Sequence, residues 1–158
     1  MDCCCPDEDL TEFKKQINKD LGTLYSEYFN ITYSCLVDET GYIVDYHIHS
    51  DEKDKSNIID KVKDLAIKAC EFKLSSVRAA KLLGFKTTSE TFIKADTHII
   101  LTYELINYLL IIVVEMSSPL IECFDFEKFK EKIDPILLNL RQVIKGKYDN
   151  AKNIDTSS

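Results

Sequence analysis

The amino-acid sequence predicts a single layered α+β domain. Segments that resemble strands fall into two clusters, short turns join the strands within each cluster, and segments with helical periodicity flank both clusters. The expected order is helix, two strands, helix, three strands, helix, and nothing indicates parallel βαβ units. At 158 residues the chain has the size of one domain and can bury a core without disulfides or metals.

The first helix is expected from Leu10 to about Tyr28, because its apolar residues recur every three or four positions. Asp9 or Thr11 can cap its start, and Gly22 weakens its middle. The apolar stripe consists of Leu10, Phe13, Ile17, Leu21, Leu24 and Tyr28.

A hairpin should follow. Residues 31–37 (ITYSCLV) and 42–49 (YIVDYHIH) are rich in residues that favour strands, and DETG lies between them. Gly41 occupies the turn position where a positive φ is most often needed. The charged stretch 50–56 is expected to be a solvated loop.

A long second helix is predicted from about Asn57 to Leu83, with Ser56 as N-cap and Gly84 just beyond its end. Its small residues would let another element approach closely, either its own sheet or a second subunit. The apolar stripe is Ile58, Val62, Leu65, Ala66, Ala69, Phe72, Val77, Ala80 and Leu83.

Three further strands are predicted at 88–96, 98–105 and 108–116. The first alternates polar and apolar residues, as an edge strand does, and the last is apolar on both faces. After a loop, a final helix should run from Asp125 to about Lys147, with a kink or restart at Pro135. We therefore divide the chain into a flexible tail (1–9), one domain (10–147) and a disordered tail (148–158).

The composition limits the classes of partner. A formal charge of −7 and a pI near 5.0 argue against nucleic acid and anionic lipid, and favour protein partners with neutral or basic surfaces. No apolar run reaches the ~20 residues of a membrane-spanning helix, and the N-terminus does not resemble a signal peptide. We therefore expect a cytoplasmic protein.

The cysteines divide into two kinds. Cys35, Cys70 and Cys123 are isolated in apolar segments and should be buried thiols in a reducing compartment. Cys3, Cys4 and Cys5 are consecutive and terminal. Three interpretations remain open for them: an unmodified tail, S-acylation that attaches the protein peripherally to a membrane, or metal or redox use.

The sequence gives little support for catalysis. His47 and His49 share a strand face, but no third metal ligand is evident from spacing, and His98 is isolated. Phosphate-binding loop motifs are absent, and the chain has only four glycines. We expect no cofactor and no catalytic residues.

The order of elements resembles the roadblock/LC7 domain, a small relative of the longin fold. The similarity covers roughly residues 10–147, and three stretches carry it: CLVDETGYIVDYHI (35–48), AAKLLG (79–84) and ETFIKADTHIILTYELINYLLIIVVEM (90–116). It implies a five-stranded antiparallel sheet with the middle helix on one face and the two terminal helices on the other. The cysteine-rich start and Pro135 depart from the pattern.

The resemblance also implies a function. Such domains form homodimers or heterodimers by pairing middle helices and third strands, and they serve as non-catalytic platforms for small Ras-like GTPases or as dynein light chains. The interface predicted on this basis comprises Ala66, Ala69, Cys70, Lys73, Val77 and Ala80 on the helix, and Thr91, Phe92, Ile93 and Lys94 on the strand.

Several functions remain as alternatives to a GTPase regulator or scaffold. A motor light chain or constitutive scaffold would bind a peptide without nucleotide dependence. A longin-like or profilin-like adaptor would act as a monomer with its third strand unpaired. An enzyme that uses the histidines is the remaining possibility.

Overall fold

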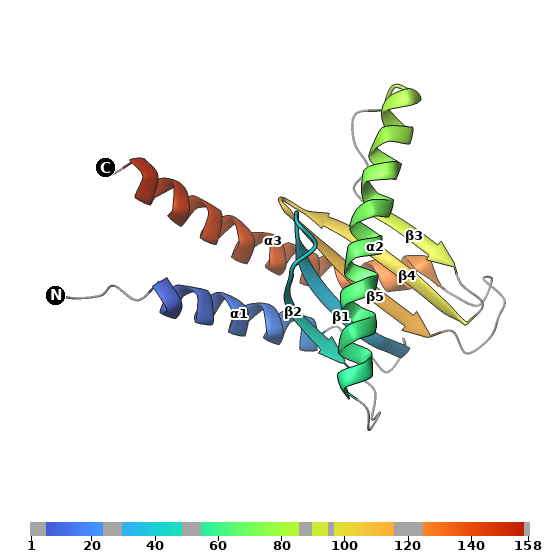
Figure 1. The fold of residues 1–158 in the computed structure, drawn as a ribbon, viewed down its shortest axis with the longest axis horizontal. Coiled ribbons are helices and arrows are strands. Elements are labelled where there is room, and N and C mark those ends of the chain that lie inside the picture. The colour runs from blue at the N-terminus through green and yellow to red at the C-terminus, as the bar shows by residue number, and fades with distance from the viewer. Residues whose placement is uncertain are drawn as a thin grey trace.

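The computed structural model describes residues 6–23, 30–48, 55–85, 90–94, 97–115 and 125–156, and it has the predicted order of elements. All five strands belong to one antiparallel sheet (Figure 1). The elements are α1 (Pro6–Gly22), β1 (Asn30–Asp38), β2 (Ile43–Ile48), α2 (Lys55–Leu82), β3 (Glu90–Lys94), β4 (His98–Leu105), β5 (Tyr108–Glu115) and α3 (Phe126–Thr156).

The strand order in the sheet is β2-β1-β5-β4-β3. The β1–β2 hairpin and the β3–β4–β5 meander meet where β1 pairs with β5, for example at Cys35 opposite Ile111. The strands that are most apolar in the sequence thus lie at the centre. The two strands with polar or charged alternation, β2 and β3, form the edges.

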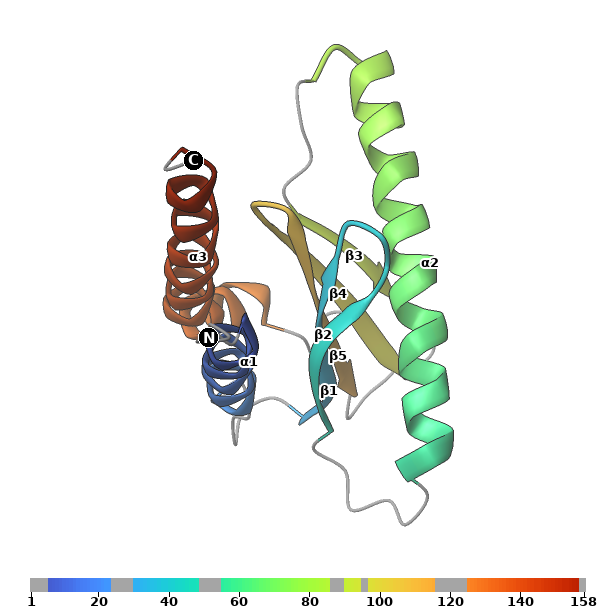
Figure 2. The ribbon, with the colours of Figure 1, turned by 60° about the vertical axis from the view of Figure 1, so that its left-hand side comes forward.

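The sheet separates two cores, because successive side chains of a strand point to opposite faces. Figure 2 shows α2 alone on one side and α1 with α3 on the other. On the α2 side, Val62 and Ala66 pack with Cys35 and Ile111. The opposite core is larger and joins Ile17, Leu36, Ile112, Ile133 and Leu140, among others.

The β1–β2 turn is built as its sequence predicts. Asp38 Oδ1 accepts hydrogen bonds from the backbone N–H groups of Thr40 (2.9 Å) and Tyr42 (3.0 Å), and from the Thr40 hydroxyl (2.6 Å). Gly41 has φ 88°, a left-handed conformation that glycine adopts without strain. Burial opposes ionisation of Asp38, but these hydrogen bonds outweigh it and hold the pKa of its carboxyl below the ordinary value.

The end of α2 also follows the sequence. The N–H of Phe85 donates to the carbonyl of Ala80 (2.8 Å) and the N–H of Gly84 to that of Lys81 (3.1 Å), which is a Schellman cap with Gly84 at φ 82°. The start differs, because α2 begins at Lys55 and so places Ser56 inside the helix. The C-terminal part of α2 extends beyond the sheet (Figures 1 and 2), which leaves Leu83 74% exposed.

The terminal helices differ most from expectation. α1 begins at Pro6 and ends at Gly22; it buries Phe13, Ile17 and Leu21 as predicted, whereas Leu24 and Tyr28 lie outside the described residues. α3 neither stops at Pro135 nor at Lys147 but continues to Thr156.

The continuity of α3 has a physical explanation. Pro135 lies on the exposed side of the helix, where the carbonyl left without a donor can be hydrated. Ile133 and Leu137 are buried on either side of it and hold both halves of the helix against the sheet. The Lys147 ammonium also stacks on the Phe13 ring at 4.1 Å, which joins α3 to α1.

Candidate interaction surfaces

The predicted interface on α2 is largely occupied by the chain's own sheet. Ala66 and Ala69 are 0% and 5% exposed and pack in the core beneath α2, and Ala80 is 7% exposed. In the single chain these three alanines of α2 are therefore buried, and their part in pairing with a partner stays a prediction. Small residues mark the face along which α2 approaches its sheet most closely, so their stripe lies on the inner side of the helix.

Three other predicted interface residues on α2 are partly buried. The Lys73 ammonium pairs with Glu104 Oε1 of β4 at 3.0 Å, which fixes the helix over the sheet. Cys70 packs against the core that contains Cys35, and Val77 is half-buried. Burial raises the pKa of the Cys35 thiol to about 12, consistent with the predicted structural role of this cysteine.

The predicted residues of β3 divide between the two faces. Thr91 lies opposite Thr102 and their hydroxyls are hydrogen-bonded, so Thr91 faces the α2 side. Phe92 faces the other side, where its ring lies 5.5 Å from that of Phe126, although it remains 56% exposed. Ile93 lies opposite Ile100 on the α2 side and is 37% exposed, and Lys94 is exposed.

Phe72, which the sequence placed in the apolar stripe of the second helix, is solvent-accessible. It is 39% exposed. At 100° per residue it lies on the flank of α2 opposite to Ile59 and Ile67, and thus toward the β3 side of the sheet. We call Phe72, Ile93 and the free backbone edge of β3 the β3 surface. A helical projection centred on Ala66 and Ala69 would have separated Phe72 from the sheet-facing stripe.

The other edge of the sheet is obstructed. The pairing of β1 with β2 shifts register between Leu36 and Val37, so β2 carries a bulge. Asp45 Oδ1 accepts the N–H of Tyr46 at 2.8 Å, which removes one donor from the outer edge. A bulge and a charged side chain are two devices by which natural sheets prevent edge-to-edge pairing.

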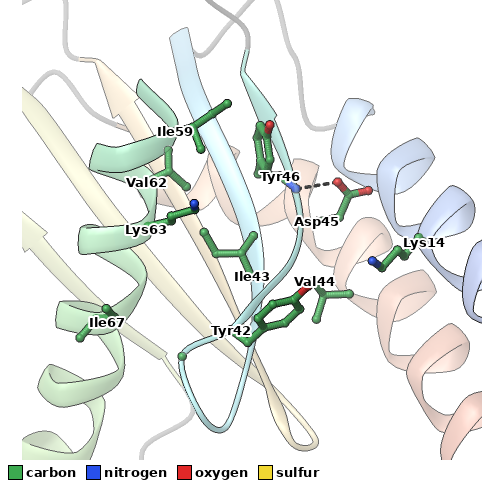
Figure 3. Close-up of a pocket in the computed structure, with 11 residues that line it drawn as sticks. Lys14, Tyr42, Ile43, Val44, Asp45, Tyr46, Ile59, Val62, Lys63 and Ile67 are labelled. Atoms are coloured by element: carbon green, nitrogen blue, oxygen red, sulfur yellow. Dashed lines mark hydrogen bonds between the residues drawn. The ribbon is translucent and has the colours of Figure 1, made fainter. Parts of the chain in front are cut away.

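Beside this edge lies an open groove between β2 and α2, with a volume of about 480 Å³ (Figure 3). We call it the β2 groove. Six consecutive residues of the hairpin form one wall, four residues of α2 form the other, and α1 contributes one. The lining residues are Gly41, Tyr42, Ile43, Val44, Asp45, Tyr46, Ile59, Val62, Lys63, Ile67 and Lys14.

Two of the three histidines, His47 on β2 and His98 on β4, lie within the described ranges. His47 lies beside α1, with its ring 3.9 Å from the position of a Cβ at Gly22, and His98 Nδ1 is hydrogen-bonded to Thr97 Oγ1 at 2.7 Å. His49, Cys3, Cys4 and Cys5 lie outside the described residues. Within the described part of the chain, no group of three His, Cys, Asp or Glu residues could hold a metal, and no helix is long and apolar enough to span a membrane.

Comparison with known proteins identifies the fold. No family model matches the sequence, and no curated protein matches it significantly. Among solved structures, Myxococcus xanthus MglB is similar with a TM-score of 0.67 at 14% identity, over 84% of this chain and 90% of that one. A roadblock/LC7 domain from Streptomyces avermitilis gives 0.64 at 11% identity, over 80% and 96% of the two chains.

A third structure, described as MglB with a tetrameric arrangement, gives a TM-score of 0.58 at 16% identity, over 90% of this chain and 92% of that one. At such identities the likeness concerns the fold alone. The architecture defines the fold class, which is a five-stranded antiparallel sheet between one long helix and two terminal helices. Within that class, the chain has the roadblock/LC7 fold, which is longin-like.

Proposed function

We propose that this chain is a non-catalytic, dimeric interaction module that scaffolds or regulates a small Ras-like GTPase. The observation that carries the proposal is the β3 surface. There, an edge strand without a bulge carries the exposed Ile93, and the exposed Phe72 lies on the flank of α2 toward that side of the sheet. The opposite edge is obstructed. A second roadblock-like domain that pairs strand to strand would satisfy the free backbone groups and cover both apolar side chains.

The mode of pairing is supported by the fold. Roadblock domains use their third strands and middle helices for pairing, and one MglB structure is described as tetrameric. In this chain the helix contribution would come from the Phe72 flank rather than from Ala66 and Ala69, because the alanines already contact the sheet. The partner can be a second copy or a different roadblock-like domain.

The GTPase assignment rests on the resemblance to domains that act as GTPase platforms. The acidic chain, with a formal charge of −7, favours a protein partner with a basic surface and disfavours nucleic acid. We place the protein in the cytoplasm, with peripheral membrane attachment only if Cys3, Cys4 and Cys5 are acylated.

The test is an affinity purification of the tagged chain from native lysate with GDP or with a non-hydrolysable GTP analogue, followed by mass spectrometry. We expect a small GTPase that is enriched under one nucleotide, and a dimer by sedimentation velocity at micromolar concentration. A motor subunit, or the same partners under both nucleotides, would instead support a constitutive light chain or scaffold. A monomer would contradict strand pairing.

A further inference from the structure

A second surface of the molecule, the β2 groove, lies on the opposite side of α2 from the β3 surface. We propose that it binds a short acidic peptide segment of a partner protein, with one large apolar side chain inserted between β2 and α2. This site does not depend on the pairing of copies or on a GTPase.

The shape of the groove fits a side chain and its neighbours. Its volume of about 480 Å³ lies within the roughly 300–1,000 Å³ of ligand pockets. The span from Ile59 to Ile67 is about 12 Å along the helix, which matches about four extended residues. Gly41 closes one end, since a Cβ at its position would lie 3.8 Å from Ile67 Cγ1.

The walls leave apolar surface uncovered. Tyr42 is 63% exposed and Ile67 is 49% exposed, and they lie at the same end of the groove (Figure 3). Ile43 and Val62 form its floor on the side of the α2 core. An aliphatic or aromatic side chain inserted here would remove apolar area from water on both partners, which favours binding.

The charged side chains at the groove determine whether an acidic or a basic peptide is favoured. Lys14 enters from α1 and Lys63 from α2, and neither ammonium forms an ion pair with any residue in the described ranges. The one carboxylate in the lining, Asp45, is hydrogen-bonded to the Tyr46 N–H. In a chain with a net charge of −7, two unpaired lysines beside an apolar hollow favour a peptide with carboxylates next to its apolar anchor.

The obstructed edge determines how such a peptide is held. The bulge in β2 and the Asp45 hydrogen bond interrupt the row of free backbone groups that strand addition requires. Recognition therefore relies on side chains, with carboxylates on Lys14 and Lys63 and an apolar group in the hollow. Affinity should accordingly be modest and salt-dependent.

The experiment is a selection of phage-displayed random octapeptides on the full-length protein, with counter-selection on the Lys14→Glu/Lys63→Glu variant. The matched control is Lys15→Glu/Lys61→Glu, which makes the same charge change at exposed positions of the same two helices, outside the groove. Synthetic peptides from the selection are then measured by fluorescence anisotropy, and circular dichroism checks the fold of each variant.

We expect peptides in which Asp or Glu flanks one or two large apolar residues. The groove double variant should weaken their binding about tenfold or more, the control variant less than about twofold, and Ile67→Ser should weaken it independently of salt. Hydrogen exchange should slow at residues 42–46 and 59–67 while the oligomeric state stays unchanged. Selection of no acidic-apolar sequence, or equal losses in both charge variants, would overturn the proposal.

Discussion

The two edge strands of this sheet, β2 and β3, differ in how accessible their outer backbone groups are to another strand. β2 carries a bulge, and the backbone N–H of its Tyr46 is hydrogen-bonded to the Asp45 side chain. The strand lies between α1 and the β2 groove. β3 pairs with β4 in regular register along its full length and leaves Phe92 and Ile93 exposed. An edge that is blocked by the chain's own side chains does not readily pair with a strand of another chain, whereas an unblocked edge can do so. The asymmetry indicates which side is available for assembly.

The largest effect should follow a charge placed on the open edge. Ile93→Lys puts an ammonium into the proposed strand pair, and we expect the dissociation constant of the dimer to rise at least about 100-fold, or ~2.7 kcal/mol. The matched control is Tyr42→Lys, which adds the same charge to an exposed apolar residue beside the other edge. Sedimentation velocity measures both variants; equal dissociation by the two would remove the distinction between the edges.

A smaller effect is expected at the turn that positions the blocked edge. Asp38→Ala removes the acceptor of three hydrogen bonds in an exposed turn, and should cost about 1–2 kcal/mol of unfolding free energy. Glu39→Ala changes the exposed neighbouring carboxylate and should cost less than about 0.5 kcal/mol. Urea denaturation at pH 7 distinguishes them, and similar losses would contradict a special role of Asp38.

The same turn predicts a pH dependence. Because folding lowers the pKa of Asp38, its ionised form stabilises the protein above the unfolded pKa of about 3.9, and that contribution disappears as the pH falls through the folded pKa. The stability difference between the wild type and Asp38→Asn should therefore be constant from pH 5 to 7 and shrink below about pH 4. A difference that grew on acidification would have the wrong sign.

Next in size is the hydrogen bond at the blocked edge itself. Asp45→Ala frees the Tyr46 N–H, and we expect a loss of about 0.5–1 kcal/mol together with faster hydrogen exchange of that amide. Asp60→Ala, at an exposed position of α2, is the control and should leave the amide unchanged. If the variant also began to self-associate through β2, the protective role of Asp45 would be demonstrated directly.

The smallest effect belongs to the ion pair that holds α2 above β4. Lys73→Met should lower the unfolding free energy by about 0.5 kcal/mol, because the pair with Glu104 is partly accessible and the new side chain keeps the apolar contacts. Lys68→Met, which removes a more exposed ion pair with Glu71, should have no measurable effect. The Lys73 effect should diminish at 1 M salt, and a larger salt-independent loss would indicate packing instead.

The sequence predicted the fold well because most of its signals are local. The Asp38–Gly41 turn, the cap at Gly84 and the apolar run of β5 each specify their element without reference to the rest of the chain. The helix ends were harder to predict, since Pro135 is tolerated only because it lies on the exposed side of α3.

The surfaces could be predicted only in part, because they depend on the orientation of α2. Ala66 and Phe72 both belonged to the apolar stripe, and they separate into a buried and an exposed residue only once the helical projection is centred on the face that packs over β1 and β5. The β2 groove joins residues of α1, the hairpin and α2. No pattern within any one of these segments indicates that they meet.

The pairing of β1 with β5 has a consequence for synthesis. α1, the β1–β2 hairpin and α2 all emerge from the ribosome before β5. Until β5 is synthesised, the edge of β1 that pairs with β5 therefore has no partner strand. Contacts such as Cys35 with Ile111 close a loop of most of the domain. The two halves of the gene therefore encode units that complete each other's sheet, and fragments divided between α2 and β3 should complement each other.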